Sequence, residues 1–166
     1  MKLFRQIALS AMITLSAFAA VVYSSCSKDA CSGVTCSNGG TCSGGNCTCT
    51  SGWGGKHCDT ADAYKFVGTY SVRETCSVSG SVGPYTATVT QSTTNQVNIL
   101  LQNFGDFSAT ITVAGSVTGT TLTIAQQTIT GYTISGSGTY NGGVITITYT
   151  VSGSNNESCT ATWTKQ

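Results

Sequence analysis

The chain contains few charged residues, one proline and one histidine. Only 8% of its 166 residues are charged, which is unlike the composition of charge-rich disordered proteins. Removing Lys2 and Arg5 from the seven basic residues leaves five from Cys26 onward, against six acidic residues, so the net charge there is −1. This balance provides no basic surface and excludes nucleic acid as a partner. Thr, Ser and Gly are abundant instead, which favours a β-rich extracellular protein.

The same scarcity restricts catalytic chemistry. A serine or cysteine nucleophile usually needs a positioned base, yet the single histidine is His57 and none occurs in residues 64–166. A glycosidase needs two carboxylates, and this part of the chain contains only Glu74, Asp106 and Glu157. Glu74 and Glu157 each stand two positions before a cysteine, so we expect both to be solvated acids at one rim of the domain. The sequence therefore predicts no enzyme and no catalytic residue.

The first 25 residues have the pattern of a signal peptide. Lys2 and Arg5 form a positive n-region, and residues 7–22 are mostly apolar over a length that suits a signal peptide better than a membrane span. The segment from Tyr23 to Cys26 resembles the lipobox of bacterial lipoproteins, in which small residues precede an acylated cysteine. This resemblance implies that residues 1–25 are removed and that Cys26 carries the acyl chains. The alternatives are an uncleaved anchor helix or a free secreted product.

The number of cysteines supports lipidation of Cys26. The chain has nine, an odd number, and a leftover thiol in an oxidising compartment needs an explanation. Two or three acyl chains on Cys26 would anchor the protein stably and leave eight cysteines to pair. Residues 27–29 resemble the short charged tract of some surface-exported lipoproteins of Gram-negative bacteria. We therefore expect an exported protein tethered to the outer membrane through residues 26–30, with surface exposure as one alternative.

Six cysteines lie close together in a segment with almost no large apolar side chains. Such a segment cannot build a hydrophobic core, so it holds one shape only if disulfides cross-link it. Many pairings are open to six cysteines, and spacing alone does not choose among them. The six are Cys31, Cys36, Cys42, Cys47, Cys49 and Cys58.

The spacing and the closing motif of this segment resemble those of an EGF-like domain. Four, five, four, one and eight residues separate the successive cysteines, and a Gly-Trp-Gly-Gly-Lys-His sequence precedes the last one. Gly52, Trp53 and Gly55 would form its closing turn. The resemblance implies a short two-stranded ribbon, a domain over residues 31–59 and a linker over residues 60–63. It also implies disulfides between Cys31 and Cys42, Cys36 and Cys47, and Cys49 and Cys58.

We expect neither a metal ion nor another cofactor in this segment. Calcium-binding members of the family have several acidic or amide ligands before the first cysteine, whereas only Asp29 stands there. Cys47, Cys49, His57 and Cys58 could hold zinc in a reducing cytosol, but export argues against this. His57 is then a solvated side chain without an assigned role.

Residues 64–166 show repeated alternation of apolar and polar side chains. Tyr85, Ala87 and Val89, for example, alternate with threonines, which is the pattern of a half-buried strand. Glycine pairs and Asn-Gly steps separate such runs, and no helical pattern appears. The predicted strands cover residues 66–76, 85–91, 96–103, 108–114, 117–124, 129–140, 144–151 and 158–165. Their order predicts a mainly β fold, an eight-stranded antiparallel up-and-down β-barrel, with an immunoglobulin-like β-sandwich as the alternative.

Cys76 and Cys159 are the two cysteines that remain. They end the first predicted strand and begin the last, and these strands are adjacent and antiparallel in a barrel with an even number of strands. A disulfide between them would join this seam, with Val72 opposite Trp163 and the cysteine face as the interior. The same pairing places Tyr70 opposite Lys165. The predicted interior also includes Ala109, Ile111, Val113, Tyr132, Ile134, Tyr140, Ile145, Ile147, Tyr149 and Val151.

The start of the first strand resembles that of lipocalin-like proteins. Gly68, Thr69 and Tyr70 are similar to the family's Gly-any-Trp signature, and Lys165 stands where the family keeps a basic partner on its last strand. The resemblance implies the barrel architecture. Two functions stay open: a non-catalytic interaction or adhesion protein that contacts a protein or glycan, and a membrane-tethered carrier of a small apolar ligand.

Overall fold

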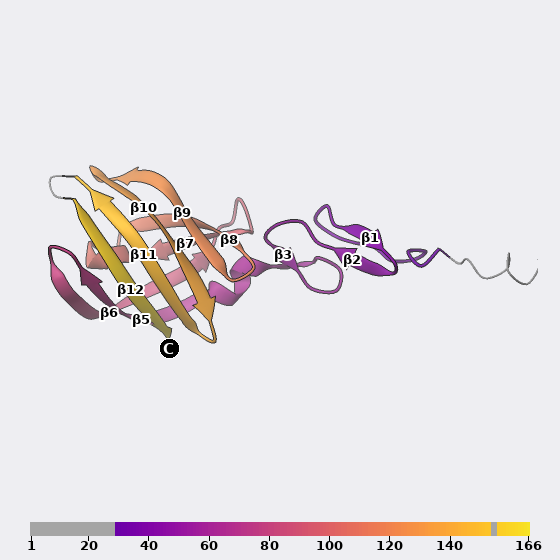
Figure 1. Cartoon of the computed structure of the whole chain (residues 1–166), viewed down its shortest axis with the longest axis horizontal. Helices are drawn as coiled ribbons and strands as arrows, with labels where there is room; N and C mark the ends of the chain where they lie inside the picture. Colours follow the sequence, from indigo (N-terminus) through magenta and orange to yellow (C-terminus); the bar gives the residue numbers. More distant parts are fainter. Residues whose placement is uncertain (1–28, 154–155) are drawn as a thin grey trace, which may run out of the picture.

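The computed structural model describes residues 29–153 and 156–166. A small disulfide-rich module precedes a closed, eight-stranded antiparallel β-barrel (Figure 1). The predicted signal peptide, residues 1–25, and the predicted lipidation site, Cys26, lie outside the described residues. Within 29–153 and 156–166, no helix combines the length and the apolar character that crossing a membrane requires.

The N-terminal module, which we define as residues 29–61, consists of two small hairpins. Strands β1 (Thr41–Ser43) and β2 (Asn46–Thr48) form the expected ribbon. Gly44 and Gly45 connect them and both have positive φ, as a two-residue type I′ turn requires. β3 (Trp53–Gly54) pairs with β4 (Thr60–Ala61).

The segment expected to be a linker, residues 60–63, is folded. Its first two residues form β4, and the next ones begin a 3-10 helix, η1 (Asp62–Phe66). Ala61, Ala63 and Phe66 are buried. Burial of these apolar side chains fixes the chain where it passes from the module to the barrel.

Each strand of the barrel pairs with an antiparallel neighbour on both sides. The strands are β5 (Gly68–Cys76), β6 (Gly80–Gln91), β7 (Asn98–Gln102), β8 (Thr112–Thr118), β9 (Thr121–Ile129), β10 (Tyr132–Asn141), β11 (Val144–Ser152) and β12 (Glu157–Lys165). They follow one another in chain order, and β12 closes the barrel against β5. The predicted barrel is confirmed, and the β-sandwich alternative is wrong.

The seam between β12 and β5 has the predicted register. Cys159 lies opposite Cys76, Trp163 opposite Val72, and Lys165 opposite Tyr70. Because β5 and β12 are antiparallel, the chain enters and leaves the barrel at the same end, which we call the proximal end. The disulfide lies at the other, distal end.

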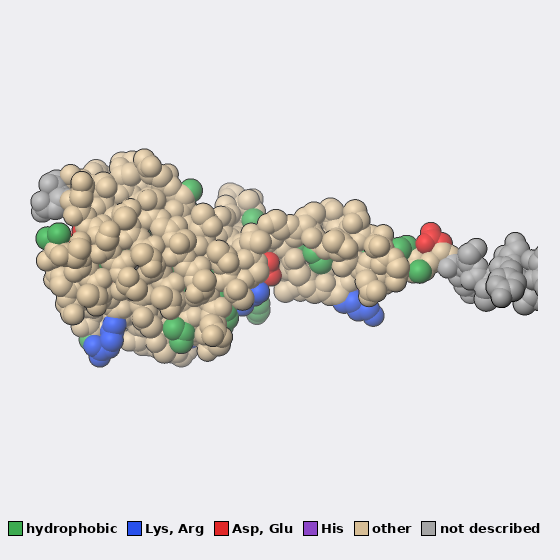
Figure 2. Space-filling model, in the orientation of Figure 1, with side chains coloured by type: hydrophobic (Ala, Val, Ile, Leu, Met, Phe, Trp, Pro, Cys, Tyr) green, Lys and Arg blue, Asp and Glu red, His purple; other side chains and the backbone are tan. Residues whose placement is uncertain are grey.

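The strand pattern correctly predicts most of the interior. Ile145, Ile147, Tyr149 and Val151 on β11 are all buried, and the threonines between them are exposed. Outward-facing threonine has high β propensity and avoids an apolar surface, which suits an exposed sheet. Figure 2 shows that few charged side chains interrupt the face in view.

Three predicted interior residues, Ala109, Ile111 and Tyr132, lie before or at the start of their strands, because strand boundaries differ from the prediction. β8 begins at Thr112, so Ala109 lies in the preceding loop and is exposed. The Ile111 N–H donates to the Ser108 carbonyl there, in a turn that an alternation pattern does not reveal. Tyr132 is the first residue of β10 and is 37% exposed.

A 3-10 segment covers each end of the barrel. η1 closes the proximal end, where the Phe66 ring packs 5.1 Å from that of Tyr140. η2 (Phe104–Asp106) closes the distal end and places the buried Phe104 ring 4.5 Å from Tyr149. The sequence shows no helical pattern for these short segments, since neither completes two turns.

Candidate functional site

The four disulfides join the predicted partners. In the N-terminal module they link Cys31 with Cys42, Cys36 with Cys47 and Cys49 with Cys58, as the resemblance to EGF-like domains implied. The fourth joins Cys76 to Cys159 across the seam, with Cα atoms 4.1 Å apart. These cross-links constrain both parts of the molecule.

The turn motif of the module lies against the barrel. Gly52 has a φ of +85° and is buried, and a Cβ atom there would approach Cγ1 of Val97 to 2.6 Å. The Gly52 carbonyl accepts a hydrogen bond from the Asp62 N–H at 2.8 Å. Gly55 also has positive φ, and Trp53 is half-buried. Of the three predicted turn residues, Gly52 therefore contacts the barrel.

Polar contacts complete this connection, which we call the junction (residues 51–52, 62, 65, 97 and 118–119). Asp62 Oδ2 accepts the Gly119 N–H at 2.7 Å, and Lys65 Nζ donates to the Gly119 carbonyl at 3.0 Å. Lys65 and Asp62 also form an ion pair at 3.2 Å. The hydroxyls of Ser51 and Thr118 lie 3.0 Å apart. The module thus extends from the proximal end of the barrel (Figure 1).

Aromatic side chains occupy the middle of the barrel. The Trp163 ring lies 6.0 Å from those of both Tyr70 and Phe104. The Tyr70 hydroxyl donates to the Phe66 carbonyl at 2.6 Å, and burial raises the pKa of this tyrosine to about 12. All four side chains are fully buried. A ligand inside the barrel would have to displace them.

Glu74 lies inside the barrel wall, so its predicted place at a solvated rim is wrong. It is 4% exposed, and the Tyr149 hydroxyl donates to its carboxylate at 2.7 Å. Burial raises the pKa of Glu74, although the hydrogen bond from Tyr149 opposes the rise. The alternation could have identified this position, because Glu74 has the same parity as Val72 and Cys76.

Glu157 lies at the distal rim, as predicted, and binds a turn. Its carboxylate accepts the backbone N–H groups of Val78 and Ser79 and the Ser79 hydroxyl. These hydrogen bonds lower the pKa of Glu157. The sulfurs of Cys76 and Cys159 lie near this carboxylate, but they form a disulfide and offer no thiolate to a metal. The two glutamates therefore do not present a pair of free carboxylates to one cleft.

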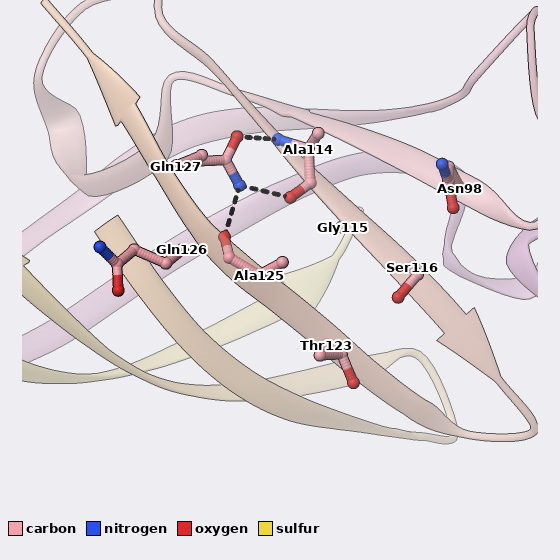
Figure 3. Close-up of a pocket in the computed structure, with 8 residues that line it drawn as sticks. All are labelled: Asn98, Ala114, Gly115, Ser116, Thr123, Ala125, Gln126 and Gln127. Carbon is pink, nitrogen blue, oxygen red and sulfur yellow. Dashed lines mark hydrogen bonds between the residues drawn. The ribbon is translucent and has the colours of Figure 1, made fainter. Parts of the chain in front are cut away.

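A groove of about 260 Å³ opens on the outer wall of the barrel (Figure 3). Its lining comes from Asn98 on β7, residues 114–116 on β8, and Thr123 and residues 125–127 on β9, and contains no charged side chain. The Gln127 side chain spans it and hydrogen-bonds both backbone groups of Ala114. No sequence motif predicted this groove. Its signal is the Gln126-Gln127 pair, which interrupts the alternation of β9.

Comparison with protein-family models, with curated proteins and with solved structures gives no match to the chain.

Proposed function

We propose that this protein is an exported, lipid-anchored cell-envelope protein that acts as a non-catalytic interaction or adhesion module. In this proposal the acyl chains on Cys26 hold it in the outer membrane, and an EGF-like module spaces a lipocalin-like barrel from the lipid. The barrel wall then contacts a protein or glycan at the cell surface.

The packing of the barrel interior carries this proposal. Trp163, Tyr70, Phe104 and Tyr149 fill the volume in which a small-ligand carrier would hold its cargo. Binding sites for small molecules are usually preformed concave cavities. The outer wall is the accessible surface, and it consists largely of hydroxyl-bearing and uncharged side chains. Binding from outside thus fits the molecule better than transport within it.

The junction supports the role of a spacer. Asp62 and Lys65 of η1, the element that directly follows the module, bind Gly119 of the barrel through charge-assisted hydrogen bonds, which are stronger than neutral ones. Three disulfides stiffen the module itself. A rigid spacer lowers the entropy lost when a tethered domain meets a partner.

The test is the mass of the full protein, isolated from its own membrane, measured intact under native and reducing conditions. We expect a chain that begins at Cys26, carries acyl groups, gains eight hydrogens on reduction of its four disulfides and releases no stoichiometric small molecule. Photo-crosslinking in intact cells should then join residues of the outer wall to a protein or glycan. A bound lipid or metabolite at one equivalent would refute the interaction role in favour of the carrier.

A further inference from the structure

Strands β8 and β9 pair along only part of their length. Their ladder runs from Thr118, opposite Thr121, to Ser116, opposite Thr123, and ends there. Residues 112–115 of β8 still pair with β7 but have no partner on the β9 side. The closed barrel therefore contains a short stretch of unpaired strand edge, in the groove shown in Figure 3.

A β-bulge in β9 accounts for this separation. On β9, two residues lie between Ile124 and Gln127. On β10, only one residue lies between their partners, Gly136 and Ile134. An extra residue in one strand bends that strand and increases its twist. Because the bulge follows directly after the last β8 pair, β9 continues along β10 while it leaves β8.

The side chain of Gln127 occupies the place that a neighbouring strand would take. Its Oε1 accepts the Ala114 N–H at 3.0 Å, and its Nε2 donates to the Ala114 carbonyl at 2.7 Å (Figure 3). A carboxamide offers the same acceptor and donor as a peptide group. In an antiparallel pair, one residue likewise exchanges both of its backbone hydrogen bonds with its partner. The chain thus satisfies this edge with a group that imitates a peptide.

The walls of the groove suit an extended backbone. Ala114, Ser116, Thr123 and Ala125 are exposed and have small side chains, so a strand can approach β8 closely. The Gln127 carboxamide is held by hydrogen bonds and not by a buried apolar anchor. An incoming peptide could replace these hydrogen bonds one for one. The free energy of the exchange is then close to zero, and the new contacts of the peptide decide whether it binds.

We propose that this groove binds an extended, uncharged segment of a partner protein, which adds to the β8 edge and displaces the Gln127 carboxamide. Main-chain hydrogen bonds at an exposed sheet edge are an established mode of peptide recognition, with side-chain pockets providing specificity. The proposal rests on the proposed function, since it assigns the partner contact to one stretch of the barrel wall and to one chemical class.

The first test is fluorescence anisotropy of the mature protein with a labelled synthetic peptide. The peptide has the uncharged sequence of β8 itself, residues 112–118 (Thr-Val-Ala-Gly-Ser-Val-Thr). A second peptide has proline at its central positions and therefore lacks the backbone N–H donors there. Gln127→Ala should tighten binding of the first peptide about fivefold or more, because two competing hydrogen bonds are lost. The proline peptide should not bind to either protein.

Charge at the groove provides the matched pair of variants. Ala114→Lys adds a charge beside the open edge, a change by which natural proteins block strand addition. Thr148→Lys places the same residue at an exposed position of β11 whose strand is paired on both sides. We expect Ala114→Lys to weaken peptide binding at least tenfold and Thr148→Lys to leave it unchanged. Near-ultraviolet circular dichroism checks that both variants fold.

Three results would overturn the inference. The first is equal peptide binding by the Ala114→Lys and Thr148→Lys variants, and the second is no gain in peptide binding by Gln127→Ala. The third is that Gln127→Ala forms a concentration-dependent dimer, which Ala114→Lys abolishes and which the peptide does not dissociate. The edge would then bind a second copy of the chain. Each of these results leaves the crosslinking and mass measurements of the proposed function unaffected. A partner crosslinked elsewhere on the wall would keep that function and refute only the groove.

Discussion

Glu74 and Glu157 lie toward the same end of the barrel, but their carboxyl groups have opposite surroundings. Glu74 faces the interior beneath Tyr149, where burial disfavours its charge. Glu157 accepts backbone and hydroxyl hydrogen bonds at the rim, where they favour its charge. Two residues of one type therefore give the folding stability opposite dependences on pH.

The pH dependence of Glu74 can be measured with Glu74→Gln. A raised pKa means that the folded state retains the proton above the ordinary value of 4.5, so the stabilisation is complete below that value and is lost as pH rises through the folded pKa. At neutral pH we expect Glu74→Gln to be more stable than the wild type, because the neutral amide removes the charge that burial disfavours. Urea denaturation at several pH values measures it.

Glu157→Gln is the control, because the sign reverses. Its lowered pKa contributes stability above the ordinary value of 4.5, which is lost as pH falls through the folded pKa. Glu157→Gln should therefore reduce stability at neutral pH and remove part of the acid sensitivity. A Glu74→Gln protein that keeps the wild-type decline with rising pH would mean that another group causes it.

Gly52 is the second position where one side chain decides the local structure. Gly52→Ala would add a Cβ atom at positive φ and against Val97. Gly33→Ala adds the same atom at a φ of +81° with nothing within 4 Å, so it isolates the cost of the conformation alone. We expect Gly52→Ala to destabilise the protein by about 1–3 kcal/mol more than Gly33→Ala, as overpacking does. Thermal unfolding followed by tryptophan fluorescence compares the two variants. An equal loss of stability would show that the Val97 side chain moves aside without cost.

Among the elements, the sequence predicted the register of the β5–β12 seam to the residue, but it did not predict where β8 begins. Two cysteines fixed the pairing of β5 with β12, and an even number of antiparallel strands made those strands neighbours. The β8 boundary depends on the turn at Ser108 and on η2, where Asn103, Gly105 and Asp106 all have positive φ. These conformations depend on packing of Phe104 beneath the loop, which alternation along the chain does not encode.

The disulfide at the seam should stabilise the barrel without creating it. Replacing Cys76 and Cys159 by serine releases a loop of 83 residues, and the chain-entropy model assigns it roughly 4–5 kcal/mol. The β5–β12 ladder and the Val72–Trp163 contact remain, so we expect a folded barrel with a lower free energy of unfolding. Guanidinium denaturation of the double variant measures the loss. A variant that no longer folds would show that the ladder alone cannot hold the seam.

At the scale of the whole molecule, the module and the barrel meet through residues that are distant in the chain. Gly52 contacts Val97, and Asp62 binds Gly119, across 45 and 57 positions. The sequence predicted the module, the barrel and a linker between them, but a contact of this kind needs the positions of both folded parts. In the sequence, only the apolar side chains of Ala61 and Ala63 indicated that this segment is buried and not a free linker.

Asp62→Ala tests whether the junction holds the two parts together. The variant loses the hydrogen bond to Gly119 and the ion pair with Lys65. In nitrogen-15 relaxation measurements the wild-type module and barrel should share one rotational correlation time, and in Asp62→Ala the module should tumble faster. Asp59→Ala is the control, because Asp59 is exposed and, among the described residues, its carboxylate accepts a hydrogen bond only from the adjacent Thr60 hydroxyl. Separate correlation times in the wild type would show that the junction is open in solution.

The return of the chain to its starting end determines how the molecule carries tension. Under the proposed lipid anchoring, a pull from the membrane would reach the barrel at Gly68 and run along β5, against ladder hydrogen bonds on both sides that lie perpendicular to the force. Many bonds then share the load together. Should they break, the disulfide at the far end of β5 keeps the strand covalently joined to β12. A pull at Gly68 would therefore load one end of the barrel without releasing β5 from it.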